Sequence, residues 1–206
     1  MLWSLHMAVY LGTSLVLDFV RPLMQLLPWR SHHFPLKNTL PDTATVLFNQ
    51  CCITYPLSVI WEPWLSGKEH GIITAWDVLY YASAFLFLEE LLFYYTHRFL
   101  HLPWFYKRIH YWHHRWKEPI AMVALSAHPV EYLTSNLLPL LAGPFLLQPP
   151  LIVTQVWIVV ATLNVVMAHS GFALLTSGNH DLHHKHLTGN FGVMGILDQL
   201  HGTSIR

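Results

Sequence analysis

The longest apolar stretch of this sequence runs from Ile72 to Leu102 and contains neither proline nor glycine. An uninterrupted stretch of this kind predicts one helix, which rises about 1.5 Å per residue and crosses the hydrocarbon of a bilayer in about 20 residues. A helix that enters the bilayer at Ile72 would therefore leave it near Leu91. His97 and His101 would then lie roughly 8 to 15 Å further on, at the headgroups or beyond them. The sequence thus places its histidine-rich segment at the mouth of a membrane span.

Four further apolar runs accompany this stretch, at residues 2–20, 43–61, 132–147 and 151–168. The 206-residue chain is 53% hydrophobic and only 11% charged, whereas soluble domains carry about 25% charged residues. We therefore expect an all-α integral membrane protein with about four transmembrane or partly inserted helices and a cytosolic, histidine-rich helical cap. Prolines within 132–147 suggest that this run is kinked or only partly inserted.

The chain is expected to have two parts. Residues 1–71 would form N-terminal membrane spans and loops, and residues 72–206 would form the domain that carries the histidines. Cys51 and Cys52 are adjacent in an apolar run, so we predict buried small hydrophobic side chains rather than a disulfide or a metal site.

The basic residues predict the orientation, because cytosolic loops carry an excess of Lys and Arg. If residues 97–131 are cytosolic and residues 132–168 form a hairpin, ten of the eleven Lys and Arg residues face the cytosol and only Lys68 does not. The histidine-rich segments are therefore expected to face the cytosol. A formal net charge of zero gives no indication of nucleic acid as a partner.

Three histidine patterns lie on that predicted cytosolic side. The first is His97-x-x-x-His101, whose rings share one helical face. The segments HYWHH at 110–114 and HDLHH at 180–184 each offer histidines at i, i+3 and i+4, so the first histidine is expected to share a face with both later ones. The eight predicted metal ligands are His97, His101, His110, His113, His114, His180, His183 and His184.

Eight imidazoles exceed the six positions of octahedral coordination, so two metal ions are expected. Neutral imidazole suits zinc, copper, iron and nickel, and offers little to calcium or magnesium. No HExxH segment is present, so a zinc protease would lack its general base. Haem is disfavoured because the histidines are expected outside the spans.

Several other side chains could belong to this site. His169 directly follows the last apolar run and is predicted as a ninth ligand. His128 could either belong to this site or form part of a structural turn. Glu131, Asp181 and Glu118 lie close by in sequence and are expected to accept hydrogen bonds from ring N–H groups.

The segments HRFLH, HYWHH and HDLHH, in this order and spacing, resemble the histidine boxes of the fatty acid hydroxylase/sterol desaturase superfamily. SAHPVEY at 126–132, AHSGF at 168–172 and GNFGVMGILDQLHGT at 189–203 make the chain similar to its C4-methylsterol oxidase branch. The resemblance covers about residue 72 to the end. Members usually carry more sequence at both ends, as expected if this chain is a short isoform or a fragment.

This resemblance implies a non-haem di-iron, O₂-dependent oxygenase of the endoplasmic reticulum, with the eight box histidines as iron ligands and zinc as a substitute in isolated protein. It also implies electrons from cytochrome b5 and its NADH-dependent reductase, which agrees with the lack of a GxGxxG segment. The basic residues Lys107, Arg108, Arg115 and Lys117 could meet an acidic partner such as cytochrome b5, or lipid headgroups.

The predicted function is oxidation of the C4-methyl group of a sterol, in sterol biosynthesis, on a lipid that arrives from the bilayer. Two alternatives stay open. One is a fatty-acyl or sphingolipid hydroxylase, and the other is a catalytically silent membrane scaffold that holds zinc. A metal transporter is disfavoured because the histidines do not follow the spans as a pathway would require.

Overall fold

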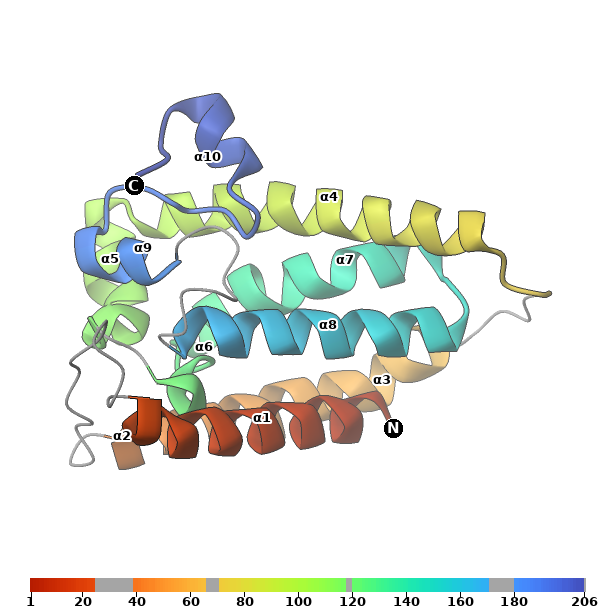
Figure 1. Cartoon of the computed structure of the whole chain (residues 1–206), viewed down its shortest axis with the longest axis horizontal. Helices are drawn as coiled ribbons and strands as arrows, with labels where there is room; N and C mark the ends of the chain where they lie inside the picture. The colour runs from red at the N-terminus through yellow and green to blue at the C-terminus, as the bar shows by residue number, and fades with distance from the viewer. Residues whose placement is uncertain (25–38, 66–70, 118–119, 171–179, 206) are drawn as a thin grey trace.

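The computed structural model describes residues 1–24, 39–65, 71–117, 120–170 and 180–205. These segments are helical and contain no strand. Figure 1 shows the long helices lying side by side along the longest axis of the molecule, with α7 between α4 and α8 and with α1 and α3 on one side of them. The predicted all-α membrane fold is confirmed.

Five helical segments are long and apolar enough to cross a membrane: Leu2–Val20, Thr39–Trp64, Ala75–Leu100, Pro129–Leu147 and Leu151–His169. The first lies within α1 (Leu2–Met24), the third is α4 (Ala75–Leu100) and the fifth is α8 (Leu151–His169). The segment 129–147 is helical from end to end despite its prolines, so it joins the candidate spans. Five such helices indicate a multi-pass membrane protein.

Two of these spans contain a π-helix in their middle. The second consists of α2 (Thr39–Phe48), the π-helix η2 (Asn49–Thr54) and α3 (Tyr55–Leu65), and the fourth consists of α6 (Pro129–Glu131), the π-helix η5 (Tyr132–Leu137) and α7 (Leu138–Leu147).

The two π-helices are joined by hydrogen bonds. The Tyr132 hydroxyl accepts from Gln50 Nε2 at 3.0 Å and lies 2.6 Å from Thr54 Oγ1. π-Helices are rare and occur frequently at functional sites. Their pairing here fixes the segment that directly follows Glu131.

The span α4 has well-defined ends. It begins at a capping box, in which Asp77 N donates to Thr74 Oγ1 at 3.3 Å and Thr74 N donates to the Asp77 carboxylate at 2.8 Å. It ends at Leu100, shortly before Pro103 starts a new helix. The helix therefore presents His97, in its last turn, at one end of the bundle.

Short helices gather at that end and form the predicted helical cap, as Figure 1 shows for α5 and α9. They are α5 (Pro103–Arg108), the 3-10 helix η3 (His110–Arg115), the 3-10 helix η4 (Ala121–Val123), α9 (His180–His186) and α10 (Ile196–His201). The cap is tied to the first span, because the Asp18 carboxylate accepts hydrogen bonds from Ala121 N and Met122 N at 2.9 and 2.8 Å.

The outward faces of the spans are apolar and exposed, which is what a surface in contact with lipid requires. Trp76 and Phe87 on α4 are 78% and 65% exposed. Cys51 and Cys52 are also exposed, so the prediction that they are buried is wrong. They lie within the candidate span Thr39–Trp64, where a bilayer would cover them.

Candidate metal centre

Nine histidines converge at the cap end of the bundle in two groups. Within each group, one ring nitrogen of every histidine lies within 4.8 Å of the corresponding nitrogens of the others. The five-histidine group contains His97, His101, His110, His114 and His183, and the four-histidine group contains His113, His169, His180 and His184. Each group could hold a metal ion, and together they contain all eight box histidines and His169.

The two later boxes are each divided between the groups. In HYWHH, on η3, His110 and His114 join the five-histidine group while His113 joins the other. The segment forms a 3-10 helix instead of the α-helix on which the sequence expectation rested. His110 was expected to share a helical face with both His113 and His114, and the structure groups it with His114 only. In HDLHH, on α9, His183 belongs to the five-histidine group, and His180 and His184 belong to the four-histidine group.

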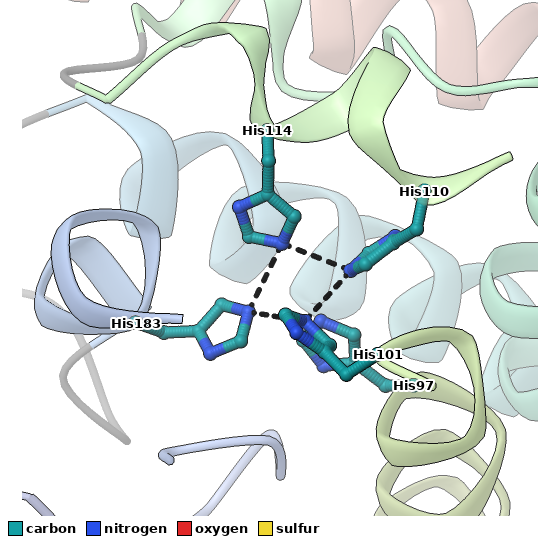
Figure 2. Close-up of side chains that lie close together, drawn as sticks. All are labelled: His97, His101, His110, His114 and His183. Carbon is teal, nitrogen blue, oxygen red and sulfur yellow. Dashed lines mark hydrogen bonds between the residues drawn. The ribbon is translucent and has the colours of Figure 1, made fainter. Parts of the chain in front are cut away.

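Four Nε2 atoms of the five-histidine group form a closed ring, as Figure 2 shows. His110 Nε2 lies 2.9 Å from His101 Nε2 and 2.9 Å from His114 Nε2. On the other side of the ring, His183 Nε2 lies 3.1 Å from the same two nitrogens of His101 and His114. Two imidazole nitrogens bound at right angles to one ion, each about 2.1 Å from it, are roughly 3.0 Å apart. The spacing of this ring therefore fits four ligands around one ion, with the His97 imidazole beside it.

Backbone carbonyls set the tautomers of five rings. A carbonyl oxygen can only accept, so each of these imidazoles carries its proton on Nδ1 and leaves a lone pair on Nε2. The Nδ1 donors and their acceptors are His97 to Phe191 O (2.8 Å), His113 to Ser126 O (3.3 Å), His169 to Val165 O (2.7 Å), His183 to Gly189 O (2.7 Å) and His184 to Trp116 O (2.9 Å).

Burial keeps these rings neutral. Desolvation, followed by the neighbouring histidines, lowers the pKa of His113 to about 3 and that of His101 to about 2. Burial also lowers the pKa values of His110, His114, His180, His183 and His184 well below the ordinary value. Neutral imidazole is the form that binds a metal.

Lone pairs that face one another need a cation between them. His113 Nε2 and His169 Nε2 lie 3.3 Å apart, although both rings donate from Nδ1 to a carbonyl. Neither nitrogen can therefore donate to the other while the rings are neutral. The buried Nε2 atoms of His180 and His184 also lack a hydrogen-bond partner in the described part of the chain. The donor chemistry of the four-histidine group thus fits a metal ion.

A buried carboxylate holds the tail that supports the five-histidine group. Asp198 accepts hydrogen bonds from Phe191 N (2.9 Å), Gly192 N (2.7 Å) and Thr203 Oγ1 (2.7 Å). Glu90 of α4 accepts from two further tail amides, Met194 N at 2.7 Å and Leu197 N at 3.0 Å. Together they fix the loop whose Phe191 and Gly189 carbonyls orient His97 and His183. The carboxylate pair Glu89-Glu90 within an apolar run is the sequence signal that could have found Glu90.

A second buried carboxylate supports the four-histidine group. Asp42 of α2 accepts from Trp116 Nε1 at 2.8 Å and from Ser126 Oγ at 2.9 Å, and it pairs with Arg115. The backbone carbonyls of the same Trp116 and Ser126 accept from His184 and His113. Asp42 thus fixes both acceptors, and no histidine pattern in the sequence points to it.

The remaining predicted side chains divide as follows. Glu131 Oε1 lies 2.8 Å from His110 Nδ1, where it was expected to orient a ring. His128 lies outside both groups, and its Nδ1 accepts from Val130 N at 3.2 Å to cap α6. The site role for His128 is therefore replaced by the structural one. The Asp181 side chain and Glu118 lie outside what the structure describes.

A cavity of about 100 Å³ opens between the spans directly beneath the four-histidine group, and His169 and His180 form part of its wall. None of the five-histidine group lines it. The four-histidine group, which also contains fewer histidines, is therefore the one that faces the space between the helices.

These features define a class: a multi-pass helical membrane protein whose two histidine groups, at one end of the bundle, could each hold a metal ion beside an intramembrane cavity. The chain belongs to the fatty acid hydroxylase family, whose model matches residues 82–203.

Its curated relatives include three kinds of lipid-related protein. Human fatty acid hydroxylase domain-containing protein 2 is 41% identical over 166 residues, which cover 77% of this chain and 50% of that protein. A very-long-chain aldehyde decarbonylase of Oryza sativa subsp. japonica is 32% identical, with 81% of this chain and 71% of that protein covered. Methylsterol monooxygenase 2-1 of Arabidopsis thaliana is 32% identical, and the match covers 63% of this chain and 48% of that protein.

The chain spans about half the length of the first of these relatives. No solved structure matches it.

Proposed function

We propose that this protein is a membrane oxygenase that uses two histidine-bound iron ions and O₂ to oxidise a lipid, most specifically the C4-methyl group of a sterol in sterol biosynthesis. The observation that carries the proposal is the pair of neutral histidine groups, with Nε2 atoms 2.9 to 3.3 Å apart, above a cavity between apolar spans. The nine proposed ligands are the members of the two groups.

Iron bound there would supply the activation of O₂, which amino acid side chains cannot perform. Insertion of one oxygen atom into a C–H bond consumes two electrons and two protons, and the second oxygen atom leaves as water. The protein keeps the imidazoles neutral and holds the tautomers of five of them through backbone carbonyls. Its cavity lies between apolar spans, where a bound lipid would be shielded from bulk water.

The sterol substrate is supported by the resemblance of the box and tail segments to the C4-methylsterol oxidase branch, and by a relative whose name is methylsterol monooxygenase. The relative named as a very-long-chain aldehyde decarbonylase favours a linear chain as the second candidate.

The electron donor that we propose is cytochrome b5 with its NADH-dependent reductase, at the endoplasmic reticulum membrane. The exposed basic side chains of Lys107, Arg108 and Lys117 lie on the cap, close to the histidine groups, and could bind an acidic partner. Arg115 is less available, because it pairs with Asp42.

This proposal requires the cap to face the cytosol. A glycosylation acceptor inserted beside Lys68 should therefore be modified in the endoplasmic reticulum lumen, while one inserted beside Lys185 should not. The measurement is the electrophoretic shift of each variant before and after deglycosylation. Modification beside Lys185 alone would reverse the orientation and would remove cytochrome b5 as the donor.

The function is tested by loss and restoration. Cells that lack the protein should accumulate 4-methyl sterols, and the wild-type gene should return sterols to normal. If non-hydroxylated acyl lipids accumulated instead, the substrate would be a linear acyl chain and the sterol proposal would be wrong. Unchanged lipids, with zinc as the bound metal, would favour the silent scaffold.

A further inference from the structure

The wall of the cavity beneath the four-histidine group contains polar side chains whose presence metal binding does not explain. Most of its wall is apolar, as a lipid site requires. Apart from His169 and His180, the lining includes seven polar side chains from four different helical segments: His6, Glu89, Tyr132, Ser135, Asn136, Thr162 and Asn164.

Ser135 is the polar group of this wall that most needs a ligand. It is 3% exposed, and its Oγ has no hydrogen-bond partner in the described part of the chain. A buried hydroxyl without a partner is unfavourable, and in native proteins such a group usually meets a ligand or a water molecule. It lies in the π-helix η5, a rare element that is frequent at functional sites.

The position of Ser135 relative to the histidines follows from the helix that carries it. Ser135 comes four residues, about one helical turn, after Glu131, whose carboxylate contacts His110. One turn corresponds to roughly 5 Å along the axis. Ser135 therefore lies just beneath the level of the histidine groups.

His6 marks a second, deeper polar point in the same cavity. Thr162 Oγ1 donates to Ile158 O at 2.6 Å and so accepts from His6 Nδ1 at 2.8 Å. This leaves the His6 Nε2 lone pair buried and without a hydrogen-bond partner among the described residues. Thr162 precedes His169 by seven residues of α8, which places His6 roughly 10 Å below the histidines.

We propose that Ser135 binds the hydroxyl group of the substrate, and that the protein oxidises a carbon only one or two bonds from the alcohol carbon. The proposal rests on the oxygenase function proposed above. A reacting carbon must approach the attacking atom at the metal site to roughly 3–3.5 Å. Ser135 lies only about one helical turn from the residue that contacts His110. A hydroxyl held at Ser135 would therefore lie within a few ångströms of the oxidised carbon. A rigid lipid alcohol with a methyl group beside its hydroxyl-bearing carbon has this geometry.

Binding of two probes to the purified protein in detergent tests the proposal. Cholestanol and cholestane share one ring system, with and without a hydroxyl. The wild-type protein should bind cholestanol about three- to tenfold more tightly, the contribution of one hydrogen bond. Ser135→Ala should bind both equally, with the affinity for cholestane unchanged. Thr134→Val is the matched control, because Thr134 is exposed in the same π-helix and its hydroxyl donates to Val130 O.

Three results would overturn the proposal: no preference in the wild-type protein, an unchanged preference in Ser135→Ala, or a preference lost only in His6→Phe. The last would place the hydroxyl roughly 10 Å from the metals. If Ser135→Ala also lost cholestane binding, Ser135→Cys would replace it. The cysteine side chain has nearly the volume of serine, but its thiol is a weak hydrogen-bond partner. Loss of the preference for cholestanol in Ser135→Cys would then support the proposal, and an unchanged preference would overturn it. Binding needs no turnover, so a failure of the oxygenase function would appear separately, in metal content and products.

Discussion

Replacing His110 with alanine is expected to lower oxygenase activity at least about 100-fold, while the protein still reaches the membrane. Changes to groups that merely orient ligands typically cost 10–100-fold in metal affinity or activity, and the loss of a ligand should cost no less. His110 Nε2 is a corner of the Nε2 ring, at 2.9 Å from two neighbours, and the side chain is buried. The readout is sterol oxidation in membranes that contain equal amounts of each variant.

Two companion variants make this result specific. His128→Ala removes a histidine of the same cap that lies outside both groups, and it should keep nearly full activity. Glu131→Gln keeps His110 but weakens the contact that orients it, so activity should fall about 10–100-fold. Full rescue by His110→Ala would mean that the chain does not act through the five-histidine group.

Replacing Asp198 with alanine is expected to destabilise the folded protein by at least about 3 kcal/mol, because two buried amides and the half-buried Thr203 hydroxyl lose an acceptor at roughly 1 kcal/mol or more each. For a chain of this length the midpoint of thermal unfolding should fall by about 6–12 °C. The five-histidine group should also lose metal affinity, since the Phe191 carbonyl that orients His97 belongs to the released loop.

The control for this variant is Asp77→Ala. Asp77 caps the opposite end of α4, far from the histidines in sequence and in space. Loss of such a cap costs about 1 kcal/mol, so its unfolding midpoint should fall only slightly and its metal content should stay constant. Equal effects of the two substitutions would show that Asp198 stabilises the protein without organising the metal centre.

The histidines that gather at the cap could be predicted from the sequence because metal binding depends on side-chain chemistry and close spacing, and both are visible in the boxes. The predicted position of His97 near the end of one long helix also agrees with the structure, since His97 lies in the last turn of α4. The division of the boxes between two groups could not be predicted. It depends on tertiary packing, which brings His101 to His110 and His183 to His114, and on the tail folding back over α4.

The supporting residues were missed for a different reason. Asp42 and Asp198 accept hydrogen bonds from groups outside the histidine boxes, and Ser135 lines a cavity formed by several helices. Such tertiary contacts leave no residue pattern in the chain. His128 was ambiguous because a histidine before a proline fits a helix cap as well as a site. Only Glu90 carried a usable signal, as a carboxylate inside an apolar run.

The number of metal ions per chain tests the central claim most directly. Wild-type protein purified with its lipids should contain about two transition-metal ions by elemental analysis. His183→Ala removes a member of the five-histidine group and His113→Ala a member of the four-histidine group, so each should retain about one ion and the double variant almost none. A double variant that keeps its full metal content, or a wild-type protein that binds none when iron is supplied, would contradict the account.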